Sequence, residues 1–498
     1  MTMLCIKQAL RYALLATIGL AAVALSESVL QNTTTLYLAF HPEVFLHQGW
    51  FVLVFAACFG LMGGCLDCPG RTTRLSSWVR MLLLLVLYIG LFQVFRRSLA
   101  VGVAVAGVWK IGLVGLCVLA AWATARRASE ATQWRIASAA SVSLLAMFAL
   151  QPGMPGYLLE SLSLTGRRQH DPAPSAAPPQ ARRTVVVVLD EWDYEIAQRE
   201  DFFTRPAMQA ALSHSYSSSQ AQPGGANTLV SVPSMLRGQP FGPVRSGSPG
   251  VLTNARDETW QAGQPSLFSD LDAASVPYSI VGFYHDYCRV FPKARHCESE
   301  PVHFFPGWWS AATRSVRRSS EYDAAYADFL RQWAGTYQHL RDAALRTAVE
   351  THSSFIWLHI NVPHPPSAVM DARPHSLKED YRSNLALTEA FVADLMQRLD
   401  AAGPDYALVL TSDHWLREKE MWRDIYARQV GPGAGDGGKT DDDQRVPFIV
   451  HFGKAEGPAV QSDQRLSTTA LRKLVPLLIQ RRVNSPQEVA EFFKQQGS

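Results

Sequence analysis

The sequence predicts an α/β domain with a mostly parallel central sheet, preceded by an all-α region of five membrane-spanning helices. Three observations support this fold class. Apolar residues crowd into the chain before Met154, and polar residues prevail after it. In the second part, short β-branched runs alternate with helical patterns, which is typical of a parallel sheet flanked by helices. With 498 residues, the chain is also too long for one ordinary core, so at least two domains are expected.

Five apolar stretches are long enough, or nearly so, to cross a hydrocarbon layer of ~30 Å. They cover residues 9–25, 49–66, 81–95, 100–123 and 136–150. Lysine and arginine gather before the first stretch and in alternate loops, which predicts a cytoplasmic N-terminus. Five spans then place the rest of the chain outside the cytoplasm. The protein is therefore expected in the inner (cytoplasmic) membrane, with its second part in the periplasm or outside the cell.

Three segments follow from this pattern. We expect a transmembrane region over residues 1–151, a linker over 152–183 and an extracytoplasmic domain over 184–498. The linker range is rich in proline and alanine and has no periodicity, as in a tether. The net charge is only +3, and no long basic run is present, so nucleic acid is excluded as the expected partner.

The elements of the second part can be placed in order. A continuous β-branched run such as TVVVVL suits a strand that is buried on both faces. The predicted strands cover residues 184–189, 278–282, 355–360, 407–410 and 447–452. Helical spacing of apolar residues predicts helices over residues 266–274, 322–350 and 381–399. Ligands of such folds gather beyond the carboxyl ends of the strands, so chemistry is expected there.

Carboxylates and imidazoles follow three of these strands. Oxygen ligands together with imidazole suit zinc, manganese or a similar divalent ion. For a single acidic residue, a helix cap is an equally good interpretation. Their recurrence at several strand ends favours a metal site, whereas Asp193 and Glu195 are expected to be solvated. The residues concerned are Asp190 and Glu191 after the first strand, His359 and His364 at the third, and Asp413 and His414 after the fourth.

A candidate nucleophile lies in the segment from Gly224 to Gly238, a flexible entry followed by a short helix. A hydroxyl at a helix N-terminus faces a positive dipole and free N–H groups that can hold a phosphate. Thr228 and Ser231 both qualify by residue type. Because proline is best tolerated in the first helical turn, Pro233 favours a helix that starts near Ser231. Capping of the helix is the alternative role for either hydroxyl.

The ordered motifs TVVVVLDE, NTLVSVPSMLRG, HINVPHPP, LVLTSDHW and RVPFIV resemble those of the alkaline phosphatase and sulfatase superfamily. Within it, the chain looks like the membrane-anchored lipid A phosphoethanolamine transferases and lipoteichoic acid synthases. Those proteins place an outer catalytic domain behind five spans. The resemblance implies an alkaline-phosphatase-like fold for residues 184–498 and, in layout only, supports the anchor.

The resemblance also implies roles for the candidate residues. It reverses the preference for Ser231, because Thr228 falls on the nucleophilic threonine of the transferases. It implies one divalent metal ion, with zinc or manganese favoured over magnesium or calcium. His364 would contact the substrate phosphate or the leaving group, and His359 is expected to bind substrate. Arg417 is a further candidate for binding an anionic substrate, with a solvated charge as the default interpretation. The implied metal ligands are Asp190, Thr228, Asp413 and His414, with Glu191 as a further candidate.

The sequence departs from these families in ways that bear on the substrate. The stretch Ser231-Val232-Pro233-Ser234-Met235 lacks the arginine that formylglycine formation requires, so a formylglycine sulfatase is not expected. The glycine that usually follows Asp-His is Trp415. The flanking cysteines and the downstream histidine of the phosphoethanolamine transferases are missing as well. Cys288 and Cys297, close together in an oxidising compartment, are expected to pair.

The resulting prediction is a membrane-anchored, metal-dependent hydrolase or transferase that acts on phosphate esters through a threonine nucleophile. Phosphoethanolamine or phosphoglycerol would move to or from an envelope lipid or glycan head group. Two alternatives remain at this point. The chain could be a catalytically inactive relative that serves as a membrane binding or assembly protein, or it could be a sulfuric ester hydrolase.

Overall fold

The structure is a computed structural model, and it divides the chain into two compact units, one mainly before residue 167 and one after residue 166. It describes residues 3–31, 52, 54–62, 65, 74–98, 107–149, 168–170, 181–248, 251–301, 319–349, 353–369, 375–439, 443–454 and 457–496. Parts of the second and fourth predicted spans lie outside these residues.

The first unit is helical. Its core contains the edge-to-face pair Tyr12 and Trp134, whose ring centroids are 4.8 Å apart, together with Leu84 and Leu87. No helix within the described ranges meets the length and hydropathy expected of a membrane span, so the five predicted spans stay a prediction. The main helices are α1 (Met3–Gln31), α3 (Arg74–Ser98), α4 (Gly107–Arg127) and α5 (Glu130–Ala149).

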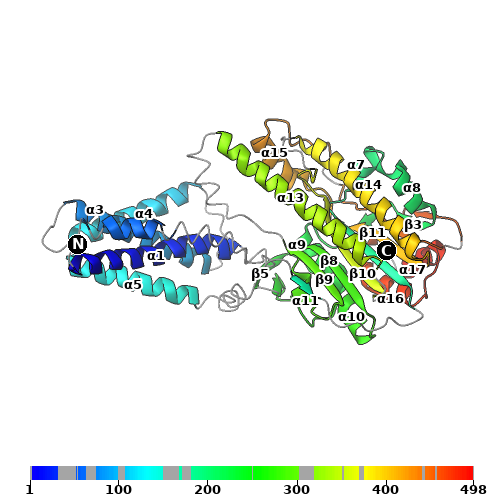
Figure 1. The fold of residues 1–498 in the computed structure, drawn as a ribbon, viewed down its shortest axis with the longest axis horizontal. Helices are drawn as coiled ribbons and strands as arrows, with labels where there is room; N and C mark the ends of the chain where they lie inside the picture. The colour runs from blue at the N-terminus through cyan, green and yellow to red at the C-terminus, as the bar shows by residue number, and fades with distance from the viewer. Residues whose placement is uncertain are drawn as a thin grey trace. The chain divides into compact units, whose positions relative to one another are not determined.

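The second unit is built on a nine-stranded sheet (Figure 1). Strands β9, β8, β10, β2 and β11 run parallel to one another, whereas β1, at one edge, and β12 are antiparallel to their neighbours in this run. The predicted, mostly parallel sheet is therefore confirmed. In spatial order the strands are β1 (Arg168–His170), β9 (His296–Pro301), β8 (Tyr278–Tyr284), β10 (Phe355–Pro363), β2 (Arg183–Asp190), β11 (Tyr406–Ser412), β12 (Phe448–Phe452), β3 (Ser215–Ser218) and β13 (Val460–Ser462).

The central strands are covered on both faces. Strand β2 owes its position to its valine run, since residues 184–190 are all buried. Helices of the first face pack on β10 and β12, and those of the second on β2 and β3. The first face carries α7 (Tyr194–Arg199), α8 (Pro206–Ser213), α13 (Ser319–Thr347) and α14 (Leu377–Ala402); the second carries α9 (Thr228–Arg237), α10 (Leu267–Ala273), α16 (Leu471–Ile479) and α17 (Pro486–Gln496).

Smaller elements complete this unit. Strand β1 lies within the range expected to be a linker and pairs with β9. The π-helical turn Glu418–Trp422 and helix α15 (Arg423–Gln429) follow the Asp-His motif. The remaining elements are α11 (Tyr287–Val290), the pair β4 (Ala221–Gln222) and β14 (Leu466–Ser467), the sheet of β5 (Val244–Ser248), β6 (Val251–Asn254) and β7 (Thr259–Gln261), and the 3₁₀ turns Phe202–Thr204 and Thr468–Ala470.

Candidate metal and nucleophile site

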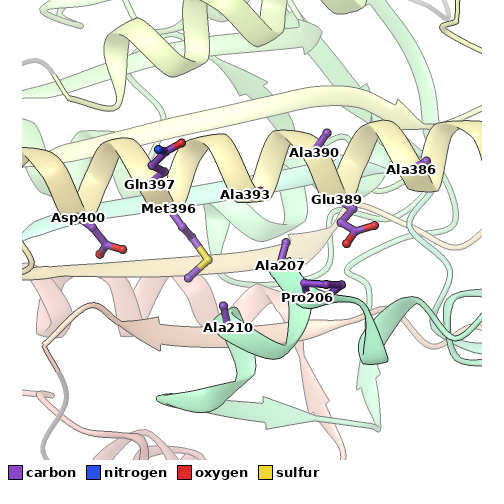
Figure 2. A pocket seen from close by; sticks show the side chains of 10 residues that line it. All are labelled: Pro206, Ala207, Ala210, Ala386, Glu389, Ala390, Ala393, Met396, Gln397 and Asp400. Carbon is purple, nitrogen blue, oxygen red and sulfur yellow. The ribbon is translucent and has the colours of Figure 1, made fainter.

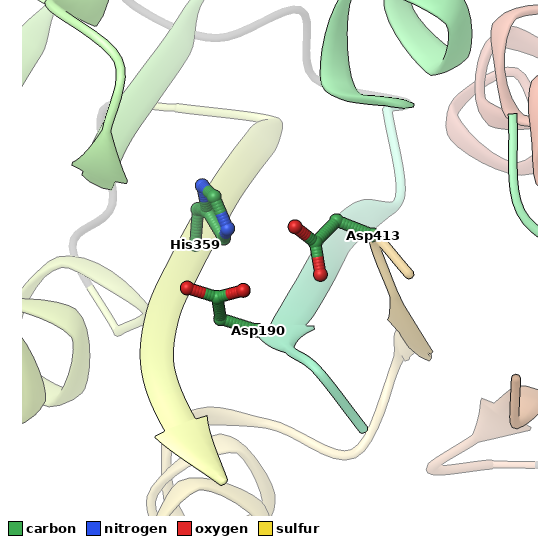
Figure 3. Close-up of side chains that lie close together, drawn as sticks. All are labelled: Asp190, His359 and Asp413. Carbon is green, nitrogen blue, oxygen red and sulfur yellow. The ribbon is translucent and has the colours of Figure 1, made fainter. Parts of the chain in front are cut away.

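The parallel register of three neighbouring strands brings distant acidic and imidazole residues together. His359 lies on β10 opposite Val188 of β2, and Ser412 ends β11 opposite Leu189. Each strand therefore ends at the same edge of the sheet. Asp190, His359 and Asp413 point toward one another there, as Figure 3 shows, and one ligand atom from each lies within 4.8 Å of the others.

These three side chains are suited to a cation. All three are buried, and Asp190 Oδ2, Asp413 Oδ2 and His359 Nε2 have no hydrogen-bond partner among the described residues. Unsatisfied buried carboxylates are costly unless a positive charge pairs with them. Two carboxylates and an imidazole are ligands that zinc and manganese accept. The residues present thus fit a divalent metal ion, and the structure adds His359 to the ligands expected from the sequence.

The acids of the site repel one another. Burial, followed by the charges of Asp413 and Glu191, raises the pKa of Asp190 well above its ordinary value. Burial also acts to raise the pKa of Asp413, but His414, His359 and other partners outweigh it and lower that pKa. One carboxylate of the pair is thus held ionised at the expense of its neighbour, as expected for close like charges without a cation.

Thr228 stands at the first position of α9, directly beside the acids. Asn227 caps the helix by accepting a hydrogen bond from Val230 N at 3.1 Å. Thr228 Oγ1 lies 3.4 Å from Asp190 Oδ1 and 3.2 Å from His414 Nε2. The hydroxyl therefore has two groups within reach that can accept its proton.

The orientation of His414 is set by the chain that follows it. Its Nδ1 lies 2.9 Å from the carbonyl oxygen of Trp415, which can only accept, so Nδ1 carries the proton. The Nε2 lone pair then faces Thr228 Oγ1, and Nε2 lies 3.3 Å from Asp413 Oδ2 and 3.7 Å from Asp190 Oδ1. Burial lowers the pKa of His414, which keeps this nitrogen available as a base or ligand.

The helix start expected near Ser231 is wrong. Helix α9 begins at Thr228 and accommodates Pro233 in its interior. The Asn227 cap satisfies the first free N–H groups and so outweighs the preference of proline for the first turn. Ser231 Oγ donates to the backbone carbonyl of Asp413 and is not in the hydrogen-bonding group of Thr228. This geometry favours Thr228 as the nucleophile.

Glu191 turns away from the three-residue cluster. Its backbone has a φ of 57°, a left-handed conformation, so its side chain leaves in a direction different from that of Asp190. Its Oε2 accepts a hydrogen bond from Trp422 Nε1 at 2.7 Å, and its Oε1 lies 3.5 Å from Arg417 Nε. The structure thus brings Glu191 to Arg417, beside the His414 ring, rather than into the cluster of Asp190 and Asp413.

His364 lies in an aromatic setting on the loop after β10. Its ring centroid is 5.2 Å from that of Trp333 and 5.0 Å from that of Trp422. Burial, with a smaller contribution from Arg417, lowers the pKa of His364 to about 3. Its Nδ1 donates to the carbonyl oxygen of Pro365 at 2.5 Å, so Nε2 carries the lone pair. His364 is therefore neutral at pH 7, and its Nε2 has no proton to give to a leaving group.

Asp193 is not solvated as expected. It is buried, caps α7 through Ile196 N at 3.0 Å and also accepts from Leu416 N at 3.2 Å. Lys439 forms an ion pair with the same carboxylate. The position of Asp193 after a strand could be predicted from the sequence. The fold shows, in addition, that the distant Lys439 neutralises its charge and that Asp193 holds the backbone of Leu416, just after the Asp-His motif.

The residues that follow β8 also lie at the site, and the sequence had not indicated them. His285 Nε2 lies 3.0 Å from the backbone oxygen of Thr228, and Tyr287 OH lies 2.9 Å from His359 Nδ1. The neighbouring Tyr284 has a φ of 72°. Because β8 is parallel to β10, its carboxyl end lies at the same edge of the sheet. Applying the strand-end rule to residues 278–282 would have found them.

A shallow groove elsewhere does not belong to this site. It lies between α8 and α14, has a volume of about 590 Å³ and is lined mainly by alanine, as Figure 2 shows. Glu389 and Asp400 add carboxylates to its lining. None of the lining residues is among the metal or nucleophile candidates, so the groove plays no part in the chemistry described here.

The fold and the site define an α/β enzyme of the alkaline phosphatase class, in which a buried acid and imidazole cluster faces a hydroxyl at a helix start. A sequence model of the sulfatase family matches residues 183–473, more than half of the chain. The chain therefore belongs to the sulfatase family, within the alkaline phosphatase superfamily. A search among curated proteins found no match.

The similar solved structures are distant in sequence. The PsFucS1 sulfatase from Pseudoalteromonas sp. is 13% identical, with 60% of this chain and 67% of that chain covered and a TM-score of 0.41. A phosphonate monoester hydrolase of Agrobacterium radiobacter is 13% identical, with 58% and 72% covered and a TM-score of 0.35. An alkaline phosphatase superfamily protein from Vibrio parahaemolyticus is 9% identical, with 61% and 68% covered and a TM-score of 0.38.

Proposed function

We propose that this chain is a metal-dependent hydrolase or transferase of phosphate esters, with Thr228 as its nucleophile. The observation that carries the proposal is the position of the Thr228 hydroxyl, 3.4 Å from Asp190 and 3.2 Å from His414 at the edge of a buried acidic cluster. A divalent cation held by Asp190, Asp413 and an imidazole would lower the pKa of such a hydroxyl and stabilise charge on phosphate.

The proposed reaction has two steps, and residues of the chain and solvent move the protons. Thr228 Oγ forms a bond to phosphorus while the bond from phosphorus to the leaving oxygen breaks, and solvent protonates that oxygen. Asp190 Oδ1 or His414 Nε2 accepts the proton of Thr228. In the second step, the oxygen of water or of an acceptor hydroxyl bonds to phosphorus, the bond from phosphorus to Thr228 Oγ breaks, and Thr228 takes back a proton from Asp190 or His414. The lone pair of His364 Nε2 can accept a hydrogen bond from the attacking water or hydroxyl, whose proton passes to solvent.

Arg417 supports an anionic substrate. Its Nε lies 3.5 Å from Glu191 Oε1, and its side chain keeps about a quarter of its surface exposed. The guanidinium is thus held by a buried carboxylate while part of it remains open to solvent. A partly exposed guanidinium beside an acidic cluster can bind phosphate oxygens and offset the repulsion that the acids exert on an anion.

The proposal extends to membrane anchoring and to an envelope lipid or glycan head group as substrate. Its support is the run of apolar stretches before residue 151, with the head group inferred from the resemblance to membrane-anchored transferases. In the first unit, Leu61 and five further aliphatic side chains are 62–65% exposed, which is unusual for a surface that faces water. The five others are Leu10, Leu14, Leu116, Leu119 and Val142.

The test compares two chromogenic esters on the purified full chain supplied with zinc or manganese. The expected result is cleavage of bis(p-nitrophenyl) phosphate and a Thr228 peptide that carries the remaining p-nitrophenyl phosphoryl group, found by mass spectrometry after rapid acid quenching. Cleavage of p-nitrophenyl sulfate alone would instead support a sulfuric ester hydrolase, the second candidate that family membership favours. Failure to bind metal and to cleave either ester would identify an inactive relative.

Membrane anchoring has a separate test. Fractionation of cells that express the full chain should recover it with the membranes after a carbonate wash. A protease added to intact spheroplasts should degrade the domain after residue 183. Release by carbonate, or protection of this domain from the protease, would contradict the proposed anchoring and localisation.

A further inference from the structure

We propose that Tyr287 is a positioning residue that directs His359 Nε2 toward Asp190 and Asp413, and that the Cys288–Cys297 disulfide holds Tyr287 in place. This inference rests on the proposed function, because it concerns the metal affinity of the same site. It gives a role to the turn from the end of β8 into α11. Neither the catalytic motifs nor the sulfatase family match explains this segment.

The Tyr287 hydroxyl contacts one nitrogen of the His359 ring and leaves the other nitrogen free of it. Tyr287 is fully buried, and its hydroxyl lies 2.9 Å from His359 Nδ1, with the ring planes at 88°. The other nitrogen, Nε2, has no hydrogen-bond partner among the described residues. If Nδ1–H donates to the Tyr287 oxygen, the Nε2 lone pair is free for a metal, and metal-ligating histidines are generally held through their second nitrogen in this way.

A glycine in strand β8 provides the space that the Tyr287 ring occupies. Gly282 of β8 lies directly opposite His359 of β10 in the parallel register. A Cβ on Gly282 would lie 2.2 Å and 2.4 Å from two carbons of the Tyr287 ring. The missing side chain therefore provides the space in which the ring lies beside His359. Any larger residue at Gly282 would displace Tyr287.

A covalent bond fixes the segment that carries Tyr287. Helix α11 has only four residues, too few to be stable by themselves. Cys288, the next residue after Tyr287, is bonded to Cys297 of β9, and Cys297 lies opposite Ile280 of β8. The disulfide thus ties the turn to the strand beside β8 and restricts the positions that Tyr287 can take.

The same turn also reaches the nucleophile. His285 Nε2 donates to the backbone carbonyl of Thr228 at 3.0 Å, since a carbonyl can only accept. Its pKa, lowered to about 3 by burial, keeps this histidine neutral. Tyr287 and His285, two residues of one short segment, therefore contact the candidate metal ligand His359 and the start of α9. Displacement of the turn would affect both parts of the site.

The experiment compares two conservative variants of the full chain, Tyr287→Phe and Tyr337→Phe. Tyr337 is a matched control, because it is equally buried and makes one hydrogen bond, at 3.1 Å, to the backbone oxygen of Leu387 on the other face of the sheet. Each variant is titrated with zinc or manganese, and its unfolding is measured without metal. A merely structural tyrosine would lower stability and leave metal affinity unchanged.

We expect Tyr287→Phe to weaken metal binding about tenfold or more, the usual effect of losing a residue that orients a ligand. Tyr337→Phe should bind metal as the wild type does. Equal metal affinity of Tyr287→Phe and the wild type would overturn the inference and leave the proposed function intact. A wild-type chain that binds no metal would overturn both, so the two failures can be told apart.

The role of the disulfide is tested by a double-mutant cycle. Cys288→Ser with Cys297→Ser should weaken metal binding in the wild-type background, but should add little to Tyr287→Phe. Such non-additivity is expected when the disulfide acts through the tyrosine. Independent, additive losses in the combined variant would overturn the claim that the bond works by holding Tyr287.

Discussion

Two clusters of acids and imidazoles in the second unit differ in how their charges are paired. In the site, Asp190 and Asp413 are buried side by side, and each has one oxygen without a hydrogen-bond partner among the described residues. On β9 and α13, by contrast, Glu298 lies between two imidazoles. His296 Nε2 is 2.9 Å from Glu298 Oε1, and His339 Nε2 is 3.3 Å from Glu298 Oε2.

The pKa values of Asp190 and Glu298 move in opposite directions. Burial and neighbouring acids raise the pKa of Asp190, whereas hydrogen bonds from His296 and His339 lower that of Glu298. Arg346 Nη2 adds a positive charge 3.6 Å from Glu298 Oε1. The acid on β9 is stabilised by its own chain, while those of the site need a positive charge from outside. Unpaired burial, rather than the presence of acid and histidine, therefore marks the functional cluster.

The largest effect is expected from removing the nucleophile. Thr228→Ala should reduce phosphodiester turnover by about 10⁴-fold or more, as the loss of a covalent nucleophile does in other enzymes. Steady-state kinetics on the chromogenic phosphodiester measure it. Ser231→Ala is the comparison, because Ser231 bonds the backbone of Asp413. A larger loss in Ser231→Ala than in Thr228→Ala would reassign the nucleophile.

The contrast between the clusters predicts where metal binds. Asp413→Asn should remove bound zinc or manganese, because it takes away a negative charge whose Oδ2 accepts no hydrogen bond within the described chain. His339→Gln, in the paired cluster, should keep the wild-type metal content. Elemental analysis after gel filtration measures both. Metal lost from His339→Gln but retained by Asp413→Asn would reverse the roles assigned to the two clusters.

Asp193, next to the site, is a buried acid that has a positively charged partner, unlike Asp190. Lys439 is nearly buried and forms its ion pair with the fully buried Asp193. Lys439→Met should lower the free energy of unfolding by about 3–5 kcal/mol, because it strands a buried charge. Adding Asp193→Asn should recover most of the loss in denaturant unfolding. A double variant no more stable than Lys439→Met would show that the pairing of charge is not the cause.

The smallest effect concerns stability and pH. The pKa of Glu298 is lowered in the folded state, so its contribution is complete above the ordinary value of 4.5 and is lost as the pH falls further. Glu298→Gln should destabilise the fold at pH 7 by about 1 kcal/mol or less, since solvent screens a partly exposed pair. The difference from wild type, measured by thermal unfolding, should shrink below pH 4.5. A constant difference would contradict it.

Several parts of the structure could be predicted because they depend on local pattern. The run TVVVVL became the buried strand β2, and the other four apolar runs also form strands of the same sheet. The rule that ligands collect at strand ends located Asp190 and Asp413 at one edge. The start of α9 was misplaced by three residues, because a side-chain cap outweighed the position of Pro233.

Thus the sequence by itself determined the alternating α/β pattern and the residue types of the site, since side-chain period and strand-end chemistry are local properties. Only the tertiary structure decided which of these residues meet. Strand register set His359 opposite Gly282 and so admitted Tyr287, a left-handed backbone turned Glu191 toward Trp422, and Lys439 reached Asp193 from 246 residues away. Such pairings depend on how the strands and loops pack, and no spacing along the chain encodes them.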